Sequence, residues 1–457
     1  MIIKDLKRIY FLGIGGIGMS ALARFFRARG AEIYGYDRTA TALTAELEKE
    51  GMVLHYEEKP EMIPDHVDLV IYTPAVPSEH AEFRVFHERG TPVMKRAEVL
   101  GMITGEMNTI AVAGTHGKTS ISTMITHILL SAGYPVNAFL GGISVNYGTN
   151  LHLDPLAGWV VTEADEYDRS FLRLFPNMAV VSAMDADHLD IYGTREAMRD
   201  AFLTFTGQIR EGGLLICHHS LRGEWAGRND VISYGIEAGD VSAHQVEVRN
   251  GHFCFTLKAG NDEFSGIEMG VPGRHNIENA LAASAVALRL GISPSQIAAA
   301  LSAYRGVRRR FEIHIDHPQL KYVDDYAHHP EEIRACLEAV KELWPGMPLT
   351  AIFQPHLFTR TRDFAKGFCE ALSVADELIL LPVYPARELP LPGVDSGLIY
   401  RGVSLKRKHL LDKKDLPAWF TGFRKGILVS MGAGDIDTLV EPLSALLKKQ
   451  IRKEERS

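Results

Sequence analysis

Residues 109–130 constrain the fold more than any other part of this 457-residue chain. Thr109–Ala113 is short, apolar and partly β-branched, which is typical of a buried strand. A glycine-bearing turn at Gly114–Lys118 follows, and Thr119–Leu130 has the polar start and apolar repeat of a helix. The stretch therefore predicts a strand, a tight turn and a helix in direct succession, the unit from which α/β folds are built.

The same stretch predicts a phosphate-binding loop. Backbone N–H groups of the turn and the helix N-terminus would face an anion, Lys118 would add a positive charge, and Thr119 would offer a hydroxyl to Mg²⁺. The spacing departs from the common G-x-x-x-x-G-K-T loop, because Val112 stands where the first glycine belongs. The alternative is a structural corner that happens to carry Gly-Lys-Thr. We interpret the stretch as a nucleoside triphosphate site.

A second strand–turn–helix unit begins at Arg8. Gly13, Gly15 and Gly18 fit the pattern G-x-G-x-x-G, and the next predicted strand, at 31–36, is followed by Asp37. An acidic residue at this distance completes a dinucleotide-binding fingerprint. The pattern does not distinguish NAD, FAD and a UDP-sugar, and by itself it would also fit a nucleotide-sugar dehydrogenase. Two structural alternatives stay open, a turn without a ligand and an Asp37 that only ends the strand.

Two further predicted strands end in acid-rich segments. The strand that starts at Trp159 ends in a cluster of acids at 163–168, and the one that starts at 179 leads to 185–190, which includes His188. Ligands of parallel α/β sheets bind at the carboxyl ends of strands, so both segments could hold a metal on ATP. Because Mg²⁺ prefers oxygen ligands, Glu163 and Thr119 are better candidates than His188. The alternative is that these acids are solvated loop residues.

The second half of the chain carries two more polar clusters. Asn276 and Asn279 lie three apart on one face of a predicted helix and could read an adenine edge, although Asn276 could instead be an N-cap. The arginines at 308–310 precede a predicted strand at 321–323, which is followed by a polar segment from 324 and a helix at 331–344. A solvated hinge is the alternative for the arginines.

Strand and helix patterns alternate along the chain, which predicts an α/β fold with domains at 1–100, 101–313 and 314–457. The net charge of −8 argues against general nucleic-acid binding. The four cysteines lack zinc-site spacing and suit a reducing compartment. Neither a signal peptide nor an apolar run of membrane-spanning length is evident, so we expect a cytoplasmic protein without a membrane or nucleic-acid partner.

The order of the motifs resembles the Mur ligase family, over about residues 8 to 435. The motifs, in chain order, are Gly-Ile-Gly-Gly-Ile-Gly-Met-Ser at 13–20, Gly-Thr-His-Gly-Lys-Thr at 114–119, Glu-Ala-Asp-Glu at 163–166, Asp-His-Leu-Asp at 187–190, His-Asn-Ile-Glu-Asn at 275–279, Arg-Arg-Phe at 309–311, Asp-Asp-Tyr-Ala-His-His-Pro at 324–330 and Phe-Gln-Pro-His at 353–356. Their shared order is more specific than any single motif.

The resemblance implies a three-domain enzyme of peptidoglycan precursor synthesis. A Rossmann-like N-terminal domain would hold a UDP-sugar, a P-loop ATPase-like central domain would hold ATP, and a Rossmann-like C-terminal domain would close over both with the amino acid. The implied activity joins L-alanine to the carboxylate of UDP-N-acetylmuramate through an acyl phosphate, with ATP and Mg²⁺, in a monomer or weak dimer. Two alternatives are a recycling ligase that attaches a murein peptide and a catalytically silent UDP-muramate sensor.

The resemblance also implies roles for individual residues. The implied catalytic residues are Lys118, Glu163, His188, Arg310 and Asp325. The implied ATP contacts are Gly114, Thr115, His116, Gly117, Lys118, Thr119, Ser120, Asn276, Asn279, Arg310 and Asp325. The implied UDP-muramate contacts are Gly15, Gly16, Gly18, Met19, Ser20, Asp37, His328 and Arg360, and the implied metal ligands are Thr119, Glu163 and His188.

The chain departs from the family pattern at three points. Leu357 stands where an arginine often follows Pro-His, so one expected substrate contact is missing or replaced. Ala327 stands where glycine is common. Some relatives use a carbamylated lysine between the phosphate loop and the third domain, but residues 119–257 contain no lysine, so we expect no such group.

Overall fold

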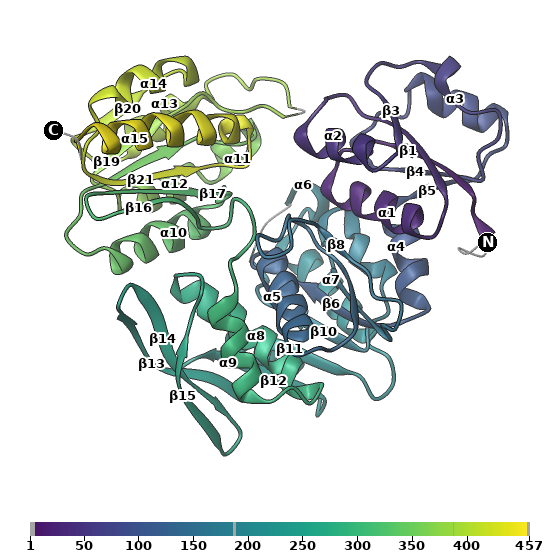
Figure 1. Cartoon of the computed structure of the whole chain (residues 1–457), viewed down its shortest axis with the longest axis horizontal. Coiled ribbons are helices and arrows are strands. Elements are labelled where there is room, and N and C mark those ends of the chain that lie inside the picture. The colour runs from purple at the N-terminus through teal and green to yellow at the C-terminus, as the bar shows by residue number, and fades with distance from the viewer. Residues whose placement is uncertain (1–4, 186–188, 387, 455–457) are drawn as a thin grey trace. The chain divides into compact units, whose positions relative to one another are not determined.

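The computed structural model describes residues 5–185, 189–386 and 388–454. Figure 1 shows the chain coloured from purple at the N-terminus to yellow at the C-terminus. The chain divides into two compact units. Unit 1 comprises Met1–His244, Leu257–Phe264 and Glu278–Leu301, and unit 2 comprises Gln245–Thr256, Ser265–Ile277 and Ser302–Ser457. The described residues form three sheets with helices between their strands, which confirms the predicted α/β class.

The first sheet, at the start of unit 1, has the strand order β3-β2-β1-β4-β5, and all its pairs are parallel. Its strands are β1 (Arg8–Leu12), β2 (Glu32–Tyr36), β3 (Val53–His55), β4 (Leu69–Tyr72) and β5 (Val93–Lys95), and its helices are α1 (Ile17–Ala28), α2 (Ala42–Lys49), α3 (Ala81–Glu88) and α4 (Arg96–Gly105). The strand order reverses at β1, so the glycine turn after β1 lies where ligands of such sheets bind.

The second sheet has the order β15-β14-β13-β12-β11-β10-β6-β9-β7-β8. Its strands are β6 (Asn108–Ala113), β7 (Val136–Phe139), β8 (Leu151–His152), β9 (Trp159–Glu163), β10 (Met178–Val181), β11 (Leu214–His218), β12 (Val231–Ile236), β13 (Val241–Arg249), β14 (His252–Ala259) and β15 (Asp262–Glu268). The helices of this region are α5 (Lys118–Ser131), α6 (Leu189–Tyr192), α7 (Arg195–Gly207), α8 (Arg274–Arg289) and α9 (Pro294–Ala303). Strand β6 lies between β10 and β9, parallel to both, so the phosphate loop and the acid-rich segment from 163 follow neighbouring strands at one edge.

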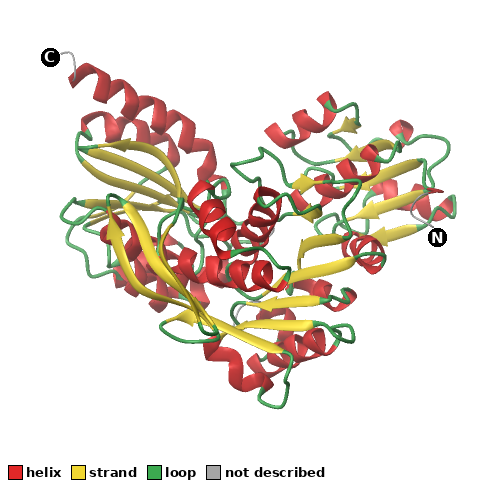
Figure 2. Ribbon diagram, turned by 60° about the horizontal axis from the view of Figure 1, so that its bottom comes forward, coloured by secondary structure: helices red, strands yellow, loops and turns green. Residues whose placement is uncertain are grey.

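The third sheet, in unit 2, has the order β16-β17-β21-β18-β19-β20, with β16 antiparallel to β17. Its strands are β16 (Glu312–His317), β17 (Leu320–Asp325), β18 (Leu349–Phe353), β19 (Glu377–Leu380), β20 (Lys408–Leu410) and β21 (Gly426–Met431). The helices are α10 (Pro330–Leu343), α11 (Phe358–Asp363), α12 (Ala365–Leu372), α13 (Ser396–Gly402), α14 (Leu416–Trp419) and α15 (Val440–Glu454), and Figure 2 shows α15 beside the strands. Short 3₁₀ helices are η2 (Pro60–Met62), η3 (Tyr167–Arg173), η4 (His219–Trp225), η5 (Lys413–Asp415), η6 (Phe420–Gly422) and η7 (Asp435–Leu439).

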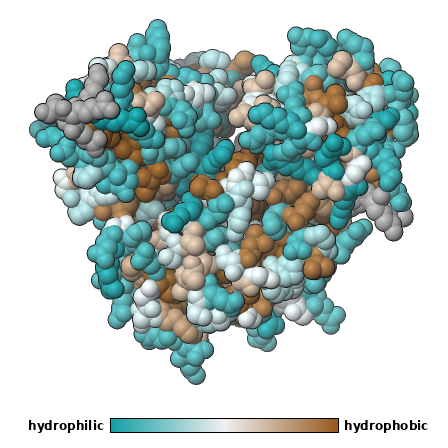
Figure 3. All heavy atoms as spheres, in the orientation of Figure 1, coloured by the Kyte–Doolittle hydropathy of each residue, from teal (hydrophilic) through white to brown (hydrophobic). Residues whose placement is uncertain are grey.

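The central strands of the sheets are buried because they are apolar on both faces. Residues Ile110–Ala113 of β6 and Leu349 and Ile352 of β18 have no exposed surface, as expected for parallel strands covered by helices. Helix α1 adds Phe25 and Phe26 to the core, and burying each aromatic side chain contributes roughly 1.5–3 kcal/mol. On the face shown in Figure 3, hydrophilic and hydrophobic residues are interspersed. No helix among the described residues has both the length and the apolar composition needed to cross a bilayer.

Two expectations from the sequence need correction. The predicted strand at 321–323 continues to Asp325, because the two aspartates that extend it are buried and hydrogen-bonded rather than solvated. Asn276 is not an N-cap, because α8 begins two residues earlier, at Arg274. The domain boundary at residue 100 stays a prediction, at a position that helix α4 spans.

Candidate functional site

The phosphate loop connects β6 to α5 with two glycines in left-handed conformations. Gly114 has φ +129°, and Gly117, the residue before α5, has φ +82°. A Cβ atom on Gly117 would lie 2.7 Å from Oδ1 of Asn279, and one on Gly114 would collide with Ser182. Glycine is therefore required at both positions, and the loop brings Asn279 next to the start of α5.

The loop is also tied to the segment that follows β10. The Thr115 N–H donates to the carbonyl of Ala183 at 3.1 Å, the Asp185 N–H donates to Oγ1 of Thr115 at 3.2 Å, and the Ser182 hydroxyl donates to the carbonyl of His116. These bonds fix the conformation of the loop. His188, predicted as a catalytic residue and metal ligand, lies outside the described residues.

Lys118 forms a buried ion pair with Glu166. Its Nζ lies 2.8 and 2.7 Å from the two carboxylate oxygens of Glu166, and it also donates to the carbonyl of Gly114 at 2.8 Å. Glu166 has no exposed surface. Burial by itself would lower the pKa of Lys118, but the carboxylates of Glu166, Asp165 and Glu163 together outweigh it, so the pKa is raised and the ammonium stays charged. Sequence reasoning did not select Glu166, although it is the second glutamate of the 163–166 motif.

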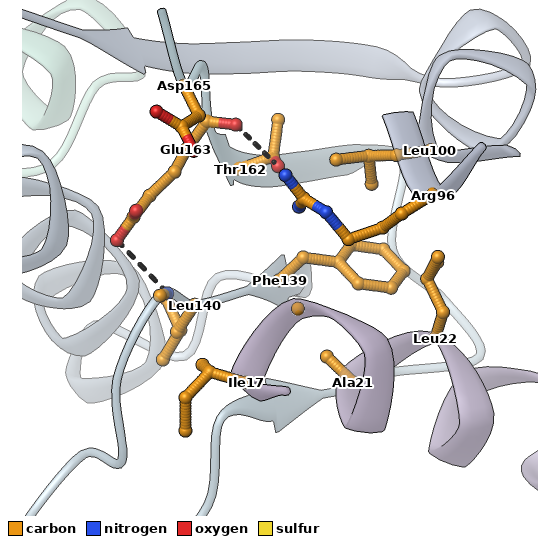
Figure 4. A pocket seen from close by; sticks show the side chains of 12 residues that line it. Ile17, Ala21, Leu22, Arg96, Leu100, Phe139, Leu140, Thr162, Glu163 and Asp165 are labelled. Atoms are coloured by element: carbon orange, nitrogen blue, oxygen red, sulfur yellow. Dashed lines mark hydrogen bonds between the residues drawn. The ribbon is translucent and has the colours of Figure 1, made fainter. Parts of the chain in front are cut away.

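A pocket of about 200 Å³ lies beside Glu163 in unit 1 (Figure 4). It is lined by Ile17, Gly18, Ala21 and Leu22 of α1, by Arg96 and Leu100 of α4, by Phe139, Leu140 and Gly141 at the end of β7, and by Thr162, Glu163 and Asp165 at the end of β9. Figure 4 shows Arg96 entering from the side of α4 while Glu163 reaches toward Leu140. One pocket thus contains Gly18, predicted to bind substrate, and Glu163, predicted to bind metal.

Two of the residues predicted to bind Mg²⁺, Glu163 and Thr119, provide oxygen ligands rather than a complete cage. Glu163 accepts a hydrogen bond from the Gly141 N–H at 3.0 Å, and Thr119 is nearly buried at the start of α5. The described residues contain no group of three or more histidine, cysteine, aspartate or glutamate side chains arranged to hold a metal. This donor set suits Mg²⁺, which usually takes one or two protein oxygens and completes its shell with substrate phosphates and water.

The glycine turn after β1 is closed by Asp37. The Gly15 N–H donates to one oxygen of Asp37 at 2.7 Å, and the Thr39 N–H donates to the other at 3.1 Å. Asp37 therefore has a structural role in the turn, whether or not it also contacts a ribose. Gly16 is exposed, whereas Met19 and Ser20 are buried, and the Ser20 hydroxyl donates to the carbonyl of Ile17 at 2.9 Å.

Two neighbouring aspartates at the end of β17, Asp324 and Asp325, have different hydrogen-bond partners. Asp324 is fully buried and accepts from Nε of Arg309 at 3.1 Å and from the Ser430 hydroxyl at 2.6 Å. Asp325 accepts the N–H groups of Phe311 and Ala327, each at 2.7 Å, and burial raises its pKa to about 6. Both carboxylates fasten the segment around residues 309–311 to the end of β17.

The remaining predicted residues of unit 2 lie near the carboxyl ends of its strands. The Arg310 guanidinium lies 4.8 Å from the ring centre of Tyr326. His328 is enclosed, its Nδ1 lies 3.0 Å from the carbonyl of Tyr326, and its N–H donates to Glu332 at 3.1 Å. Burial, with a smaller effect from the positive charge of Arg360 on α11, lowers the pKa of His328 to about 4 despite the opposing carboxylate of Glu332, so the imidazole is neutral at neutral pH.

Helix α8 carries both asparagines predicted to contact adenine. Asn276 is nearly buried, and its Nδ2 donates to the carbonyl of Pro272 at 2.7 Å. Asn279 is also nearly buried and belongs to unit 1, beside the phosphate loop. The structure therefore brings Lys118 and Asn279 to one loop, and Gly18 and Glu163 to one pocket. It gathers Asp325, His328 and Arg310 in unit 2.

Comparisons with known proteins agree with the motif order. The chain matches the Mur ligase family catalytic domain at residues 8–106, the Mur ligase middle domain at 112–287 and the Mur ligase glutamate ligase domain at 309–429. It is 45% identical to a UDP-N-acetylmuramate–L-alanine ligase of Parabacteroides distasonis, over 99% of this chain and 100% of that protein. It is 44% identical to the ligase of the same name from Phocaeicola vulgatus, over 98% and 100%. The crystal structure of a UDP-N-acetylmuramate–alanine ligase from Thermotoga maritima superposes with a TM-score of 0.82 at 27% identity, over 99% of both chains.

Proposed function

The chain belongs to the Mur ligase family, and on that premise we propose that it is an ATP-dependent ligase that joins L-alanine to UDP-N-acetylmuramate. This activity makes an amide bond in the synthesis of peptidoglycan precursors. The support is full-length similarity to ligases of that name, together with a phosphate loop, a neighbouring acid-lined pocket and a third α/β sheet.

The chemistry explains why such a site needs a triphosphate. A carboxylate is a poor electrophile, so its oxygen first takes the γ-phosphoryl group of ATP, which forms an acyl phosphate and releases ADP. The amine of alanine then attacks the carbonyl carbon, and the tetrahedral intermediate expels inorganic phosphate and loses a proton. Catalysis of these steps depends mainly on positioning and on neutralising charge.

The observation that carries the proposal is the arrangement at the carboxyl edge of the second sheet. Lys118 lies in the phosphate loop after β6, and Glu163 lines the pocket after the neighbouring strand β9. We assign Lys118 to the transferred phosphate, and we assign Glu163 with Thr119 to Mg²⁺, which when bound would neutralise phosphate charge. In unit 2 we assign Arg310 to the phosphates as well.

The substrate contacts are proposals of the same kind. We assign the turn at Gly15–Gly18, with Asp37, to the pyrophosphate and ribose of the UDP-sugar, since its N–H groups and the start of α1 suit an anion. We assign His328 and Arg360 to the muramate end, where a neutral imidazole and a guanidinium could bind carboxylates. We assign Asp325 to the ribose of ATP.

We further propose that the protein works in the cytoplasm as a monomer or weak dimer. The observation that supports the cytoplasm is that all four cysteines are free. Free cysteines suit a reducing compartment, where ATP is also available.

The deciding experiment measures ADP release with UDP-N-acetylmuramate and a panel of amine substrates. We expect L-alanine to support turnover well above glycine, L-serine and a murein tripeptide. Preference for the tripeptide would instead identify a recycling ligase. Binding of UDP-N-acetylmuramate without ADP formation from any amine would remove the ligase assignment and leave a sensor.

A further inference from the structure

The head group of Lys118 is fully engaged with acceptors of the protein itself. An ammonium has three protons, and the Lys118 Nζ has three acceptors within 2.8 Å, which are the carbonyl of Gly114 and both carboxylate oxygens of Glu166. A phosphate oxygen can therefore bind Lys118 directly only if one of these acceptors gives way.

Glu166 is a buried counter-ion on a fixed main chain rather than a surface acid. Its side chain has no exposed surface. Its own carbonyl accepts from the Tyr192 hydroxyl at 2.6 Å and from the Arg169 N–H at 3.0 Å, so the main chain that carries it is fixed as well. An exposed carboxylate would be screened by water, but a buried one acts on Lys118 with little screening.

The carbonyl of Gly114 is the less mobile of the two partners. It belongs to the loop itself, four residues before Lys118, and the glycine conformation at φ +129° sets its direction. The Glu166 side chain has rotatable bonds and two oxygens on the same ammonium. The acceptor that yields to phosphate is therefore an oxygen of Glu166.

We propose that Glu166 is a positioning residue that neutralises Lys118 in the nucleotide-free enzyme and releases at least one of its two bonds when phosphate binds. The ammonium of Lys118 then exchanges the carboxylate of Glu166 for a phosphate as its counter-ion and is never without one. This role rests on the proposed function, because it assumes that the loop binds ATP. Glu166 would thus change nucleotide binding indirectly, by its contact with Lys118.

The exchange predicts that nucleotide affinity rises when Glu166 loses its charge. Glu166→Gln keeps the shape and one acceptor for Lys118 but removes the competing anion. Asp165→Asn is the matched control. Asp165 is the neighbour of Glu166 and has the same charge, but it acts on Lys118 only through space, whereas Glu166 accepts two hydrogen bonds from the Lys118 ammonium.

The test measures the dissociation constant of ADP by calorimetry at fixed ionic strength. We expect Glu166→Gln to bind ADP about tenfold tighter than the unchanged protein, on the scale of one charge-assisted hydrogen bond. Asp165→Asn should change the constant less than about threefold, as expected for a partly screened charge without a direct bond. An unchanged or weaker affinity in Glu166→Gln, or an equal gain in both variants, would overturn the exchange.

A second measurement needs no variant. In a crystal structure of the unchanged protein with ADP or a non-hydrolysable ATP analogue, Lys118 should bond a phosphate oxygen and have lost at least one Glu166 oxygen. Retention of both Glu166 bonds with phosphate bound would contradict the proposal. If the unchanged protein binds no adenine nucleotide at all, the proposed function fails instead, so the two failures are distinguishable.

Discussion

Substitution of two adjacent arginines, Arg309 and Arg310, should affect different properties of the protein, and Arg309→Ala is the more informative change. The Arg309 guanidinium donates to the buried Asp324 at 3.1 Å and to the carbonyl of Gly432 at 2.7 Å. Arg309 also has a left-handed backbone, with φ +62°. The neighbouring Arg310 lies over the ring of Tyr326. We therefore expect Arg309 to determine the stability of unit 2 and Arg310 to determine turnover.

The magnitude follows from the burial of Asp324. Removing one partner of a buried ion pair costs about 3–5 kcal/mol, and the 20% exposure of the Arg309 side chain favours the lower end. The bond from Ser430 remains, so we expect Arg309→Ala to lower the free energy of unfolding by about 3 kcal/mol. Arg309→Gly should cost about 1 kcal/mol less, because glycine relieves the strain of the left-handed backbone.

The assay must report on unit 2, because a two-unit chain need not unfold in one step. Hydrogen exchange of peptides from β17 and β21, followed by mass spectrometry, measures the local free energy of opening. Arg310→Ala is the control, since loss of the ring contact should cost no more than about 1 kcal/mol. That variant should lose roughly a hundredfold or more in ADP release, as when one charge-stabilising group is removed.

Two results would refute this reasoning. Arg309→Ala with native exchange rates in β17 would mean that Asp324 does not depend on its guanidinium partner. Arg310→Ala with full turnover would show that the arginine assigned to phosphate has no part in the reaction.

Three further predictions concern the metal, the loop and pH. Glu163→Gln keeps an acceptor for the Gly141 N–H and should raise the Mg²⁺ concentration for half-maximal ADP release about tenfold. An unchanged Mg²⁺ titration would show that Glu163 is not a metal ligand. Gly117→Ala should weaken ADP binding, because the new methyl meets Asn279, whereas Gly133→Ala, with a similar φ of +73° and no atom within 4 Å, should not; equal losses would show that backbone strain alone matters. Between about pH 4 and 6, Asp325→Asn should make the stability of unit 2 rise more steeply with pH, because a folded-state pKa raised to about 6 makes the native state lose stability as pH rises. His328→Gln should have the opposite effect, so that the stability of unit 2 rises less steeply with pH than in the unchanged protein. The reason is that a pKa lowered to about 4 destabilises the native state as pH falls from 6.5. Thermal melts across this range check both, and equal slopes in all three proteins would contradict the assignment.

The local elements of the fold were predictable because short-range rules determine them. The predicted strands at Thr109–Ala113 and 31–36 match β6 and β2 to within one residue, and helix α5 begins at Lys118, one residue before the predicted start. Apolar runs, glycine turns and helix starts depend on neighbours along the chain, so the sequence carries that information directly.

The acidic residues were predictable as a group but not in their partners. Glu163 and Glu166 belong to the same short motif, yet Glu163 reaches the Gly141 N–H and a pocket, while Glu166 is buried on Lys118. Asp324 and Asp325 were expected in a polar segment, and burial with hydrogen-bond partners makes them the end of a strand instead.

The order of the chain's motifs, with a Gly-Lys-Thr turn between a strand and a helix, a second glycine turn and alternating strands and helices, was enough to predict an α/β fold that resembles one ligase family. Which of several like residues pair became visible in three dimensions. Lys118 meets Glu166 across 48 positions, and Arg309, not Arg310, meets the buried Asp324 across 15. The reason is physical: the strength of a charge pair depends on distance and burial, and both are set by how the strands are ordered in the sheets rather than by any local pattern.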